Sequence, residues 1–248
     1  AAAAGGASAP REEDEEEGWC EVGKGQKTST VTNPDILKDQ VETMISKYFR
    51  GTLRSELHKE GSGGHISATF QPFQCLQLHI DDQRVSKVEE ALANFFCEEH
   101  IDGLKNEKNN LNIKARRSYK LQLLPKVLVL HLKRFCFDPV RGQPVKLSQR
   151  ITFPAQLRIP TSVMSHTLKS QSSNGAGPTY IYSLFSAVFH HGQHITSGHY
   201  TNFCRDDVGT WRYFDDQKVY DASIQDVLRF KDGSCYLLFY AIDGARSC

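Results

Sequence analysis

The sequence predicts an α+β fold with a mainly antiparallel sheet. Strand-like runs follow one another through the last third of the chain, in "TYIYSLFSAVFHH", "GHYTNFCR", "TWRYFD" and "SCYLLFYAI". A further apolar run, "VLVL", has the length of one buried strand. Helical spacing is clear only in "SKVEEALANFF", and strands that succeed one another without helices favour antiparallel pairing.

The elements before that region are expected in the following order. Residues 31–47 are predicted to be a linker or a short helix, and a strand is predicted to start at Pro72, because apolar and polar side chains alternate after it. Ser86 and Glu89 have the spacing of a capping box. A helix of about three turns should follow, with its apolar side chains at helical spacing: Val88, Leu92 and Phe95.

Two further strands and a loop complete the middle of the chain. Pro125 opens an apolar strand that ends in charged or polar residues, among them Lys133 and Arg134. "ITFPAQLRIP" predicts a short strand bounded by prolines. "SHTLKSQSSNGAGP" is rich in Ser, Gly and Asn, which predicts a surface loop.

The ends of the chain have the composition of unstructured segments. Residues 1–30 contain "AAAAGGASAP" and a block of six acidic residues, which cannot bury enough apolar surface to offset chain entropy, so we expect disorder there. Residues 244–248 are expected to be a tail. The folded domain is therefore predicted to span residues 48–243. Since the sequence starts with alanine, we also expect that it is a fragment of a longer product.

Composition narrows the classes of partner. The net charge is +1, with 30 basic and 29 acidic residues, which is not the excess of positive charge typical of a nucleic-acid binder. No run reaches the roughly 20 apolar residues of a membrane span. Seven cysteines, an odd number without a preceding signal peptide, predict reduced thiols and a cytoplasmic or nuclear location. We therefore expect a protein partner, with neither nucleic acid nor membrane.

A hairpin near the C-terminus sets a histidine beside an aspartate. If residues 206–210 form the turn, Arg205 faces Trp211 and Phe203 faces Tyr213. His199 and Asp215 are then diagonal neighbours on one face, with Cα atoms roughly 7–8 Å apart. A one-residue bulge would bring Asp216 to that face instead.

Such a pair has a chemical use. A carboxylate holds an imidazole in one tautomer and stabilises its protonated form, as a general base for a thiol or hydroxyl nucleophile requires. The alternative is structural: His199 would be a surface residue of the hairpin, and the aspartates would cap its turn. The pattern alone leaves both interpretations open.

Six blocks of the sequence carry a family resemblance. They are "FQPFQCLQLHI", "LQLLPKVLVLHLKRF", "ITFPAQLRIP", "YSLFSAVFHHGQHITSGHYTNFCR", "WRYFDDQKV" and "CYLLFYA". In this order they are similar to the successive blocks of the ubiquitin-specific protease family. The resemblance implies a thiol-dependent ubiquitinyl hydrolase that cleaves the isopeptide bond after the C-terminal glycine of ubiquitin. It also implies ubiquitin and ubiquitinated proteins as partners.

The resemblance implies particular site residues. The catalytic histidine falls on His199 and its acidic partner on Asp215, with Asp216 next to it in an assisting position. The loop that covers the ubiquitin tail falls on "HHGQHITSG", so that Gly198, Tyr200 and His191 are the residues expected to contact the tail. Plain loop polarity is the alternative explanation for the three histidines of that loop: His190, His191 and His194.

The implied fold is that of the papain-like cysteine protease superfamily, with an antiparallel palm and a fingers extension from about residue 49 to residue 117. The family's cysteine box, similar to G-x-x-N-x-G-N-T-C, is missing here, and so is its helical thumb. The cysteines present are expected to be small buried hydrophobes, so the nucleophile would lie upstream. Without a thumb, we expect poor stability or aggregation of this chain on its own. The alternative is a catalytically inactive scaffold or regulatory protein that binds ubiquitin.

A second departure from the family concerns zinc. Many members carry two Cys-x-x-Cys pairs in the fingers, and the corresponding segments of this chain contain none. His58, His65 and His100 lie nearby, but each is expected to be a solvated loop residue. We therefore expect no metal and no other cofactor.

Overall fold

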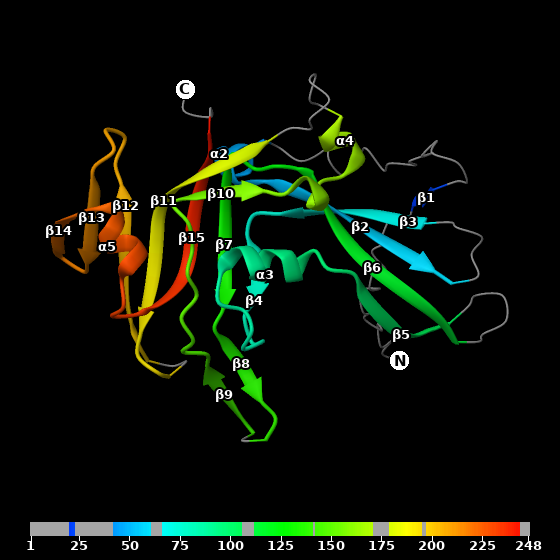
Figure 1. The fold of residues 1–248 in the computed structure, drawn as a ribbon, viewed down its shortest axis with the longest axis horizontal. Helices are drawn as coiled ribbons and strands as arrows, with labels where there is room; N and C mark the ends of the chain where they lie inside the picture. Colours follow the sequence, from blue (N-terminus) through cyan, green and yellow to red (C-terminus); the bar gives the residue numbers. More distant parts are fainter. Residues whose placement is uncertain are drawn as a thin grey trace, which may run out of the picture.

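The fold comprises two large sheets and a projecting hairpin (Figure 1). The computed structural model describes residues 42–60, 66–105, 112–140, 142–170, 179–194 and 197–243, and the backbone of Cys20–Val22. The predicted α+β class, with few helices and mainly antiparallel sheets, is confirmed.

The larger sheet, which we call the palm sheet, has eight strands. Their order is β14-β13-β12-β11-β15-β7-β4, and β10 pairs with β11. Every pair is antiparallel except β4 with β7, which the sequence did not indicate. The strands are β4 (Leu76–His79), β7 (Val127–Lys133), β10 (Gln156–Ile159), β11 (Tyr180–His191), β12 (His199–Arg205), β13 (Trp211–Asp215), β14 (Lys218–Ala222) and β15 (Ser234–Ile242).

The smaller sheet, which we call the fingers sheet, has the order β1-β3-β2-β6-β5. The predicted extension from residue 49 to residue 117 differs from it in three ways: the sheet continues to residue 123, it also includes β1, and β4 within that range joins the palm. His58 and His100 lie in its strands and not in loops. The strands are β1 (Cys20–Val22), β2 (Gly51–Lys59), β3 (Ile66–Phe73), β5 (Glu99–Lys105) and β6 (Asn112–Leu123).

The helices are short. The helix predicted from Val88 forms, as α3, but it has 8 residues and its N-terminus is bound by Glu90, not Glu89. Glu90 accepts from the backbone N–H groups of Ser86 and Lys87 because the N-cap is Lys87, one residue later than predicted, so that Glu90 is the third residue of the helix. The helical elements are α2 (Met44–Phe49), α3 (Val88–Phe95), η1 (Thr161–Val163), α4 (His166–Lys169) and α5 (Ile224–Arg229).

One core joins α3 to the palm sheet. Leu78, Val88, Leu130 and Leu238 are all 0% exposed. The buried Tyr182 donates its hydroxyl to Pro125 O at 2.6 Å, which satisfies its polar end inside this core. The apolar run after Pro125 is thus a central strand, with β15 on one side and β4 on the other.

Local predictions failed where turn chemistry or tertiary pairing decided the outcome. Pro72 lies near the end of β3, and the strand breaks at Gln74 and Cys75 before β4 begins. The expected loop after Ser165 begins with α4, which Ser165 caps by accepting from Leu168 N. The pattern also gave no sign of β14 or α5.

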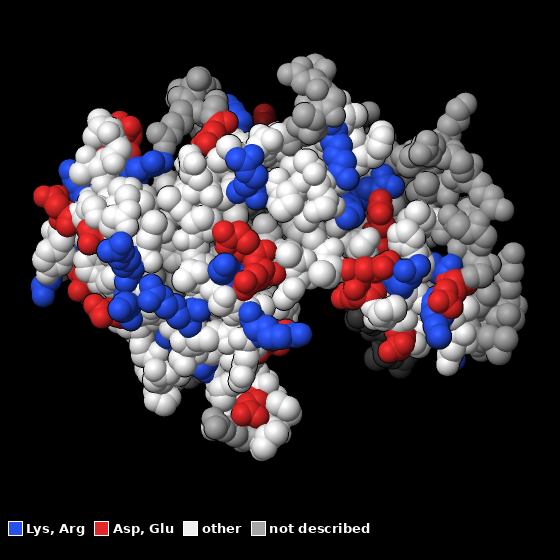
Figure 2. All heavy atoms as spheres, in the orientation of Figure 1, with Lys and Arg blue, Asp and Glu red and all other residues white. Residues whose placement is uncertain are grey.

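The terminal predictions are mostly untested. Cys20–Val22 pair with β3, so the expected disorder fails at these residues, and the rest of residues 1–30 lies outside the described part. Residues 244–248 and His65 lie outside it as well. Among the described residues, no helix is long and apolar enough to cross a membrane. Basic and acidic side chains are interspersed over the face in Figure 2.

Candidate active site

The hairpin of β12 and β13 has the predicted register. Phe203 pairs with Tyr213 and Arg205 with Trp211. In the turn, Asp206 accepts from Thr210 N at 2.7 Å through its carboxylate. β12 and β13 pair without a bulge from Asn202 and Phe214 to the turn, and it is Asp215 that meets His199.

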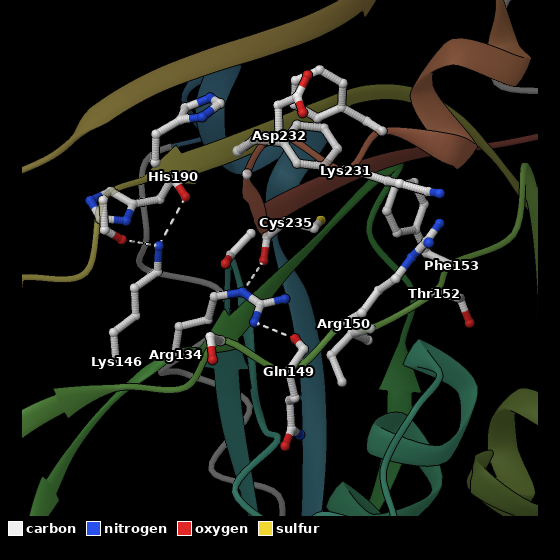
Figure 3. A pocket seen from close by; sticks show the side chains of 18 of the residues that line it. Arg134, Lys146, Gln149, Arg150, Thr152, Phe153, His190, Lys231, Asp232 and Cys235 are labelled. Atoms are coloured by element: carbon white, nitrogen blue, oxygen red, sulfur yellow. Dashed lines mark hydrogen bonds between the residues drawn. The ribbon is translucent and has the colours of Figure 1, made fainter.

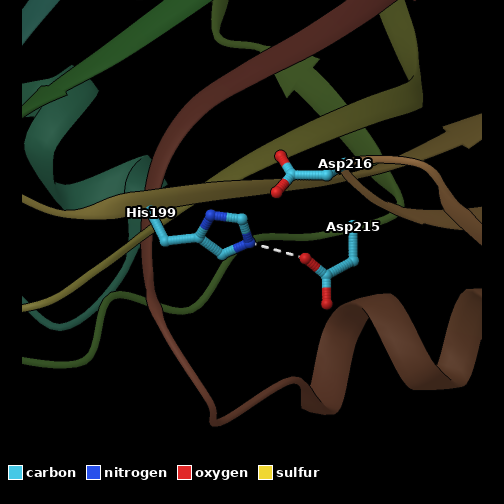
Figure 4. A group of neighbouring side chains, drawn as sticks. All are labelled: His199, Asp215 and Asp216. Atoms are coloured by element: carbon cyan, nitrogen blue, oxygen red, sulfur yellow. Dashed lines mark hydrogen bonds and ion pairs between the residues drawn. The ribbon is translucent and has the colours of Figure 1, made fainter.

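This register brings His199 and Asp215 into contact (Figure 4). Nε2 of the imidazole lies 2.5 Å from Asp215 Oδ1, and the two side chains are 43% and 36% exposed. Because an ionised carboxylate only accepts, Nε2 carries the proton and Nδ1 is left with the lone pair. No hydrogen-bond partner of Nδ1 is found in the described part of the chain.

Asp216 forms the corner between β13 and β14. Its φ is 50°, in the left-handed region that Asn, Asp and Gly tolerate best. Its carboxylate approaches the His199 ring from another side than Asp215 does (Figure 4). Donor atoms of His199, Asp215 and Asp216 lie within 4.8 Å of one another. Such a group has the ligand types of a metal site. The His199 ring and the Asp215 carboxylate are hydrogen-bonded to each other, however, and we assign no ion to the group.

His191 lies on the His199 side of the sheet. The two residues pair directly between β11 and β12, and the ring centroids are 5.7 Å apart. His191 Nε2 lies 2.7 Å from the hydroxyl of the buried Thr201. Burial lowers the pKa of His191, and the nearby His199 acts in the same direction. Its hydrogen bonds are therefore made within the fold.

Aromatic rings gather on the opposite face, around His190. Its ring lies 4.8 Å from that of Tyr200 and 5.4 Å from that of Phe135, centroid to centroid. His190 is 2% exposed and its buried Nδ1 finds no hydrogen-bond partner among the described residues, whereas Tyr200 is 49% exposed. Burial lowers the pKa of His190. Tyr200 thus offers an aromatic surface beside His199.

Gly198 packs closely against β11. A Cβ there would clash with His190 Nε2 and would lie 2.6 Å from His191 O. The residue before His199 must therefore lack a side chain whatever the ligand. Close packing of β12 against β11 is thus one reason for a glycine at this position, and the contact with the ubiquitin tail implied by the resemblance stays a prediction.

A cavity of about 570 Å³ adjoins the site (Figure 3). Arg134, at its edge, is 1% exposed and donates to the carbonyls of Leu147, Gln149 and Cys235. Lys146 donates to His190 O at 3.0 Å and to Gly192 O at 2.6 Å. The sequence indicates Arg134 only as the charged end of a strand and gives no sign of Lys146. No local signal distinguishes the buried Arg134 or the half-buried Lys146 from surface cations.

The described cysteines do not complete the site. None of Cys75, Cys97, Cys136, Cys204 and Cys235 forms a hydrogen bond with His199 among the described residues. Burial raises the pKa of Cys235 to about 12, as the prediction of a buried thiol requires. Cys75, Cys136 and Cys204 are only partly buried, and the prediction is wrong for Cys97, which is exposed because α3 ends before it.

Sequence comparison places this site in a known family. The profile described as "Ubiquitin carboxyl-terminal hydrolase" matches residues 23–240. Ubiquitin hydrolase B of Dictyostelium discoideum is 34% identical over 228 residues, which is 92% of this chain and 46% of that protein. Ubiquitin carboxyl-terminal hydrolase 10-A of Xenopus laevis is 35% identical over 231 residues, or 92% of this chain and 28% of that protein.

Structural comparison agrees. The SAGA DUB module Ubp8/Sgf11/Sus1/Sgf73 bound to ubiquitin aldehyde contains a similar chain, with a TM-score of 0.70 and 32% identity over 83% of this chain and 44% of that one. A variant of the same module bound to monoubiquitin gives a TM-score of 0.69 at 32% identity, over 82% and 42% of the two chains. This chain spans less than half the length of these relatives. On this evidence, the chain belongs to the ubiquitin carboxyl-terminal hydrolase family, whose members are cysteine deubiquitinases.

Proposed function

We propose that this chain supplies the base and the orienting acid of a thiol-dependent ubiquitinyl hydrolase. The substrate would be an isopeptide between the C-terminal glycine of ubiquitin and a lysine. The observation that supports this proposal most strongly is the contact of His199 Nε2 with Asp215 Oδ1, which leaves Nδ1 available to a thiol.

The chemistry follows from the tautomer. Nδ1 of His199 takes the proton of a cysteine thiol, and the thiolate attacks the glycine carbonyl. The imidazolium, stabilised by Asp215, then gives this proton to the departing lysine amine, which leaves a thioester. Water, deprotonated by the same ring, releases ubiquitin and restores the thiol. Asp216 is proposed to assist by adding negative charge beside the ring.

The nucleophile is proposed to come from a part of the protein outside the described residues. This proposal agrees with the absence of any described cysteine bound to His199. The same observation favours the second candidate, a ubiquitin-binding scaffold or regulator that cleaves nothing. Turnover separates the two.

Ubiquitin is the proposed partner, and its tail is proposed to reach the base past Gly198 and Tyr200. The exposed ring of Tyr200 offers apolar surface there. His191 was expected to contact the tail as well, but its bonds within the fold favour another role, developed below. We also propose a cytoplasmic or nuclear location and partners that include neither nucleic acid nor membrane. The proposed division of the chain is into residues 1–30, 31–47, 48–243 and 244–248.

Cleavage of a fluorogenic ubiquitin derivative tests the proposal. The protein to use is the complete product of the gene that encodes this chain, with His199→Gln as the variant and His166→Gln, an exposed histidine of α4, as the matched control. We expect turnover that is lost only in the His199 variant. Ubiquitin binding without turnover would favour the scaffold, and full activity of His199→Gln would contradict the proposal.

A further inference from the structure

The His191 ring is held by a hydrogen bond at one nitrogen and lies close to the Asp232 backbone. Nε2 lies 2.7 Å from Thr201 Oγ1. The Asp232 backbone raises the pKa of the ring, as a carbonyl that faces a ring N–H does. Because Nε2 faces Thr201, the nitrogen that faces Asp232 is Nδ1.

Packing leaves this ring little freedom. A Cβ on Gly233 would lie 2.9 Å from His191 Cε1, so only a glycine allows the Asp232 segment to approach the ring so closely. The Phe230 ring meets it edge to face, at 6.2 Å and 86°. Thr201 is 3% exposed, so that rotation of the imidazole would leave a buried hydroxyl without its acceptor.

These contacts select one tautomer of a neutral ring. Burial lowers the pKa of His191, and the positive charges of His199 and Lys146 act in the same direction. The Asp232 carbonyl and Asp215 oppose them. A neutral ring with its proton on Nδ1 can donate to Asp232 and accept the hydroxyl hydrogen of Thr201 at Nε2.

The position of Thr201 connects this ring to the candidate base. Thr201 lies two residues after His199 in β12, and their side chains share one face of the sheet. His191 therefore ties the strand that carries His199 to the segment just before β15. Its neutral ring, 5.7 Å from the His199 ring, adds no second positive charge when His199 becomes protonated.

We propose that His191 is a positioning residue for His199, which it holds through Thr201 as the neutral Nδ1–H tautomer. This inference rests on the proposed role of His199 as the base. It assigns His191 to the interior of the site in place of contact with the ubiquitin tail.

The tautomer itself is the first test. The chain labelled with ¹⁵N-histidine, in solution at neutral pH, should show His191 with a protonated Nδ1 and an unprotonated Nε2. A protonated Nε2, or averaging of the two nitrogens, would overturn the inference. This measurement needs no variant and no catalysis.

The second test asks whether the hydrogen bond between His191 and Thr201 affects His199. In Thr201→Val, the proton on His199 Nε2 should exchange with water up to about tenfold faster, the effect of one lost hydrogen bond. Thr201→Ser should restore the slow exchange, and His166→Gln should leave it unchanged. A folded Thr201→Val with unaltered exchange would overturn the inference, and if this variant does not fold, the tautomer decides.

The outcomes separate this inference from the proposed function. An inactive protein with the Nδ1–H tautomer and a Thr201-dependent His199 proton would contradict only the proposed hydrolase activity. An active enzyme with a protonated His191 Nε2 would contradict only the positioning role. In an active enzyme, positioning further predicts that Thr201→Val lowers kcat and leaves KM nearly unchanged.

Discussion

The two faces of the β11–β12 pair give neighbouring histidines different surroundings. On one face, His191 and His199 lie opposite each other, with Thr201 next to them and Asp215 bound to His199. On the other, His190 lies opposite Tyr200 among aromatic rings. Aromatic rings pack on both faces, but His191 and His199 also take part in side-chain hydrogen bonds, whereas His190 Nδ1 finds no hydrogen-bond partner among the described residues.

The difference teaches that adjacent histidines in "HHG" cannot be assigned a common role. Side chains alternate along a strand, so His190 and His191 meet opposite environments although they are neighbours in sequence. The same holds for His199 and Tyr200 in "GHY", which we assign to proton transfer and to an apolar contact. The predictions below test this separation, beginning with the largest expected effect.

Loss of Asp215 should have the largest effect. Asp215→Ala removes the carboxylate that orients His199, and we expect kcat/KM of the complete protein for fluorogenic ubiquitin to fall by about 10²–10⁴-fold. Asp216→Asn keeps a residue that tolerates positive φ at the corner, and in this variant kcat/KM should fall by less than about tenfold. The reverse order would mean that Asp216, and not Asp215, orients the ring.

Gly198→Ala should destabilise the fold, because Gly198 packs against residues of both faces. The added methyl group would clash with the His190 ring and with His191 O, so β12 must shift from β11. We expect a loss of about 1–3 kcal/mol in the free energy of unfolding, measured in urea. Ser197→Ala, at the exposed neighbour, is the control and should be nearly neutral. Equal stability of the two variants would show that the packing role is wrong.

Two adjacent substitutions compare the faces directly. Thr201→Val leaves His191 Nε2 without its buried partner and should destabilise the chain by about 1–2 kcal/mol. Tyr200→Phe, on the other face, removes a hydroxyl for which no hydrogen bond is seen among the described residues, and should stay within about 0.5 kcal/mol. Urea unfolding of both variants measures the contrast, and equal losses would remove the distinction between the faces.

A modest dependence on pH should come from His190 and His191. Burial lowers the pKa of each in the folded chain, so the unfolded chain, with values near about 6.5, binds protons first as the pH falls. Stability should therefore be highest above about pH 6.5 and decline toward lower pH. Thermal unfolding at about pH 7.5 and about pH 5.5 measures this decline, and a Tm that rises toward pH 5.5 would contradict the assigned directions.

Local patterns predicted the hairpin of the site well. The turn at residues 206–210 and the alternation of side chains fix which residues of β12 and β13 face each other. His199 and Asp215 could therefore be paired from the sequence before the fold was known. The choice between Asp215 and Asp216 depended on the absence of a bulge, which no local pattern encodes.

The remainder depends on contacts between distant segments. The burial of Arg134 requires carbonyls of Leu147, Gln149 and Cys235, the last of them 101 residues away. The parallel pairing of β4 with β7 and the locked ring of His191 likewise arise only when separate segments meet. Propensity and spacing describe one segment at a time, so these features could not be predicted from them.

The central claim is that His199 and Asp215 activate a thiol located outside the described residues. Its most direct test is the reaction of ubiquitin bearing a cysteine-reactive C-terminal group with two proteins: the chain alone, and the complete gene product. We predict no adduct with the chain alone, and with the complete product an adduct whose formation is abolished in His199→Ala. A His199-dependent adduct on the chain alone, or an unaltered rate in His199→Ala of the complete product, would contradict the claim.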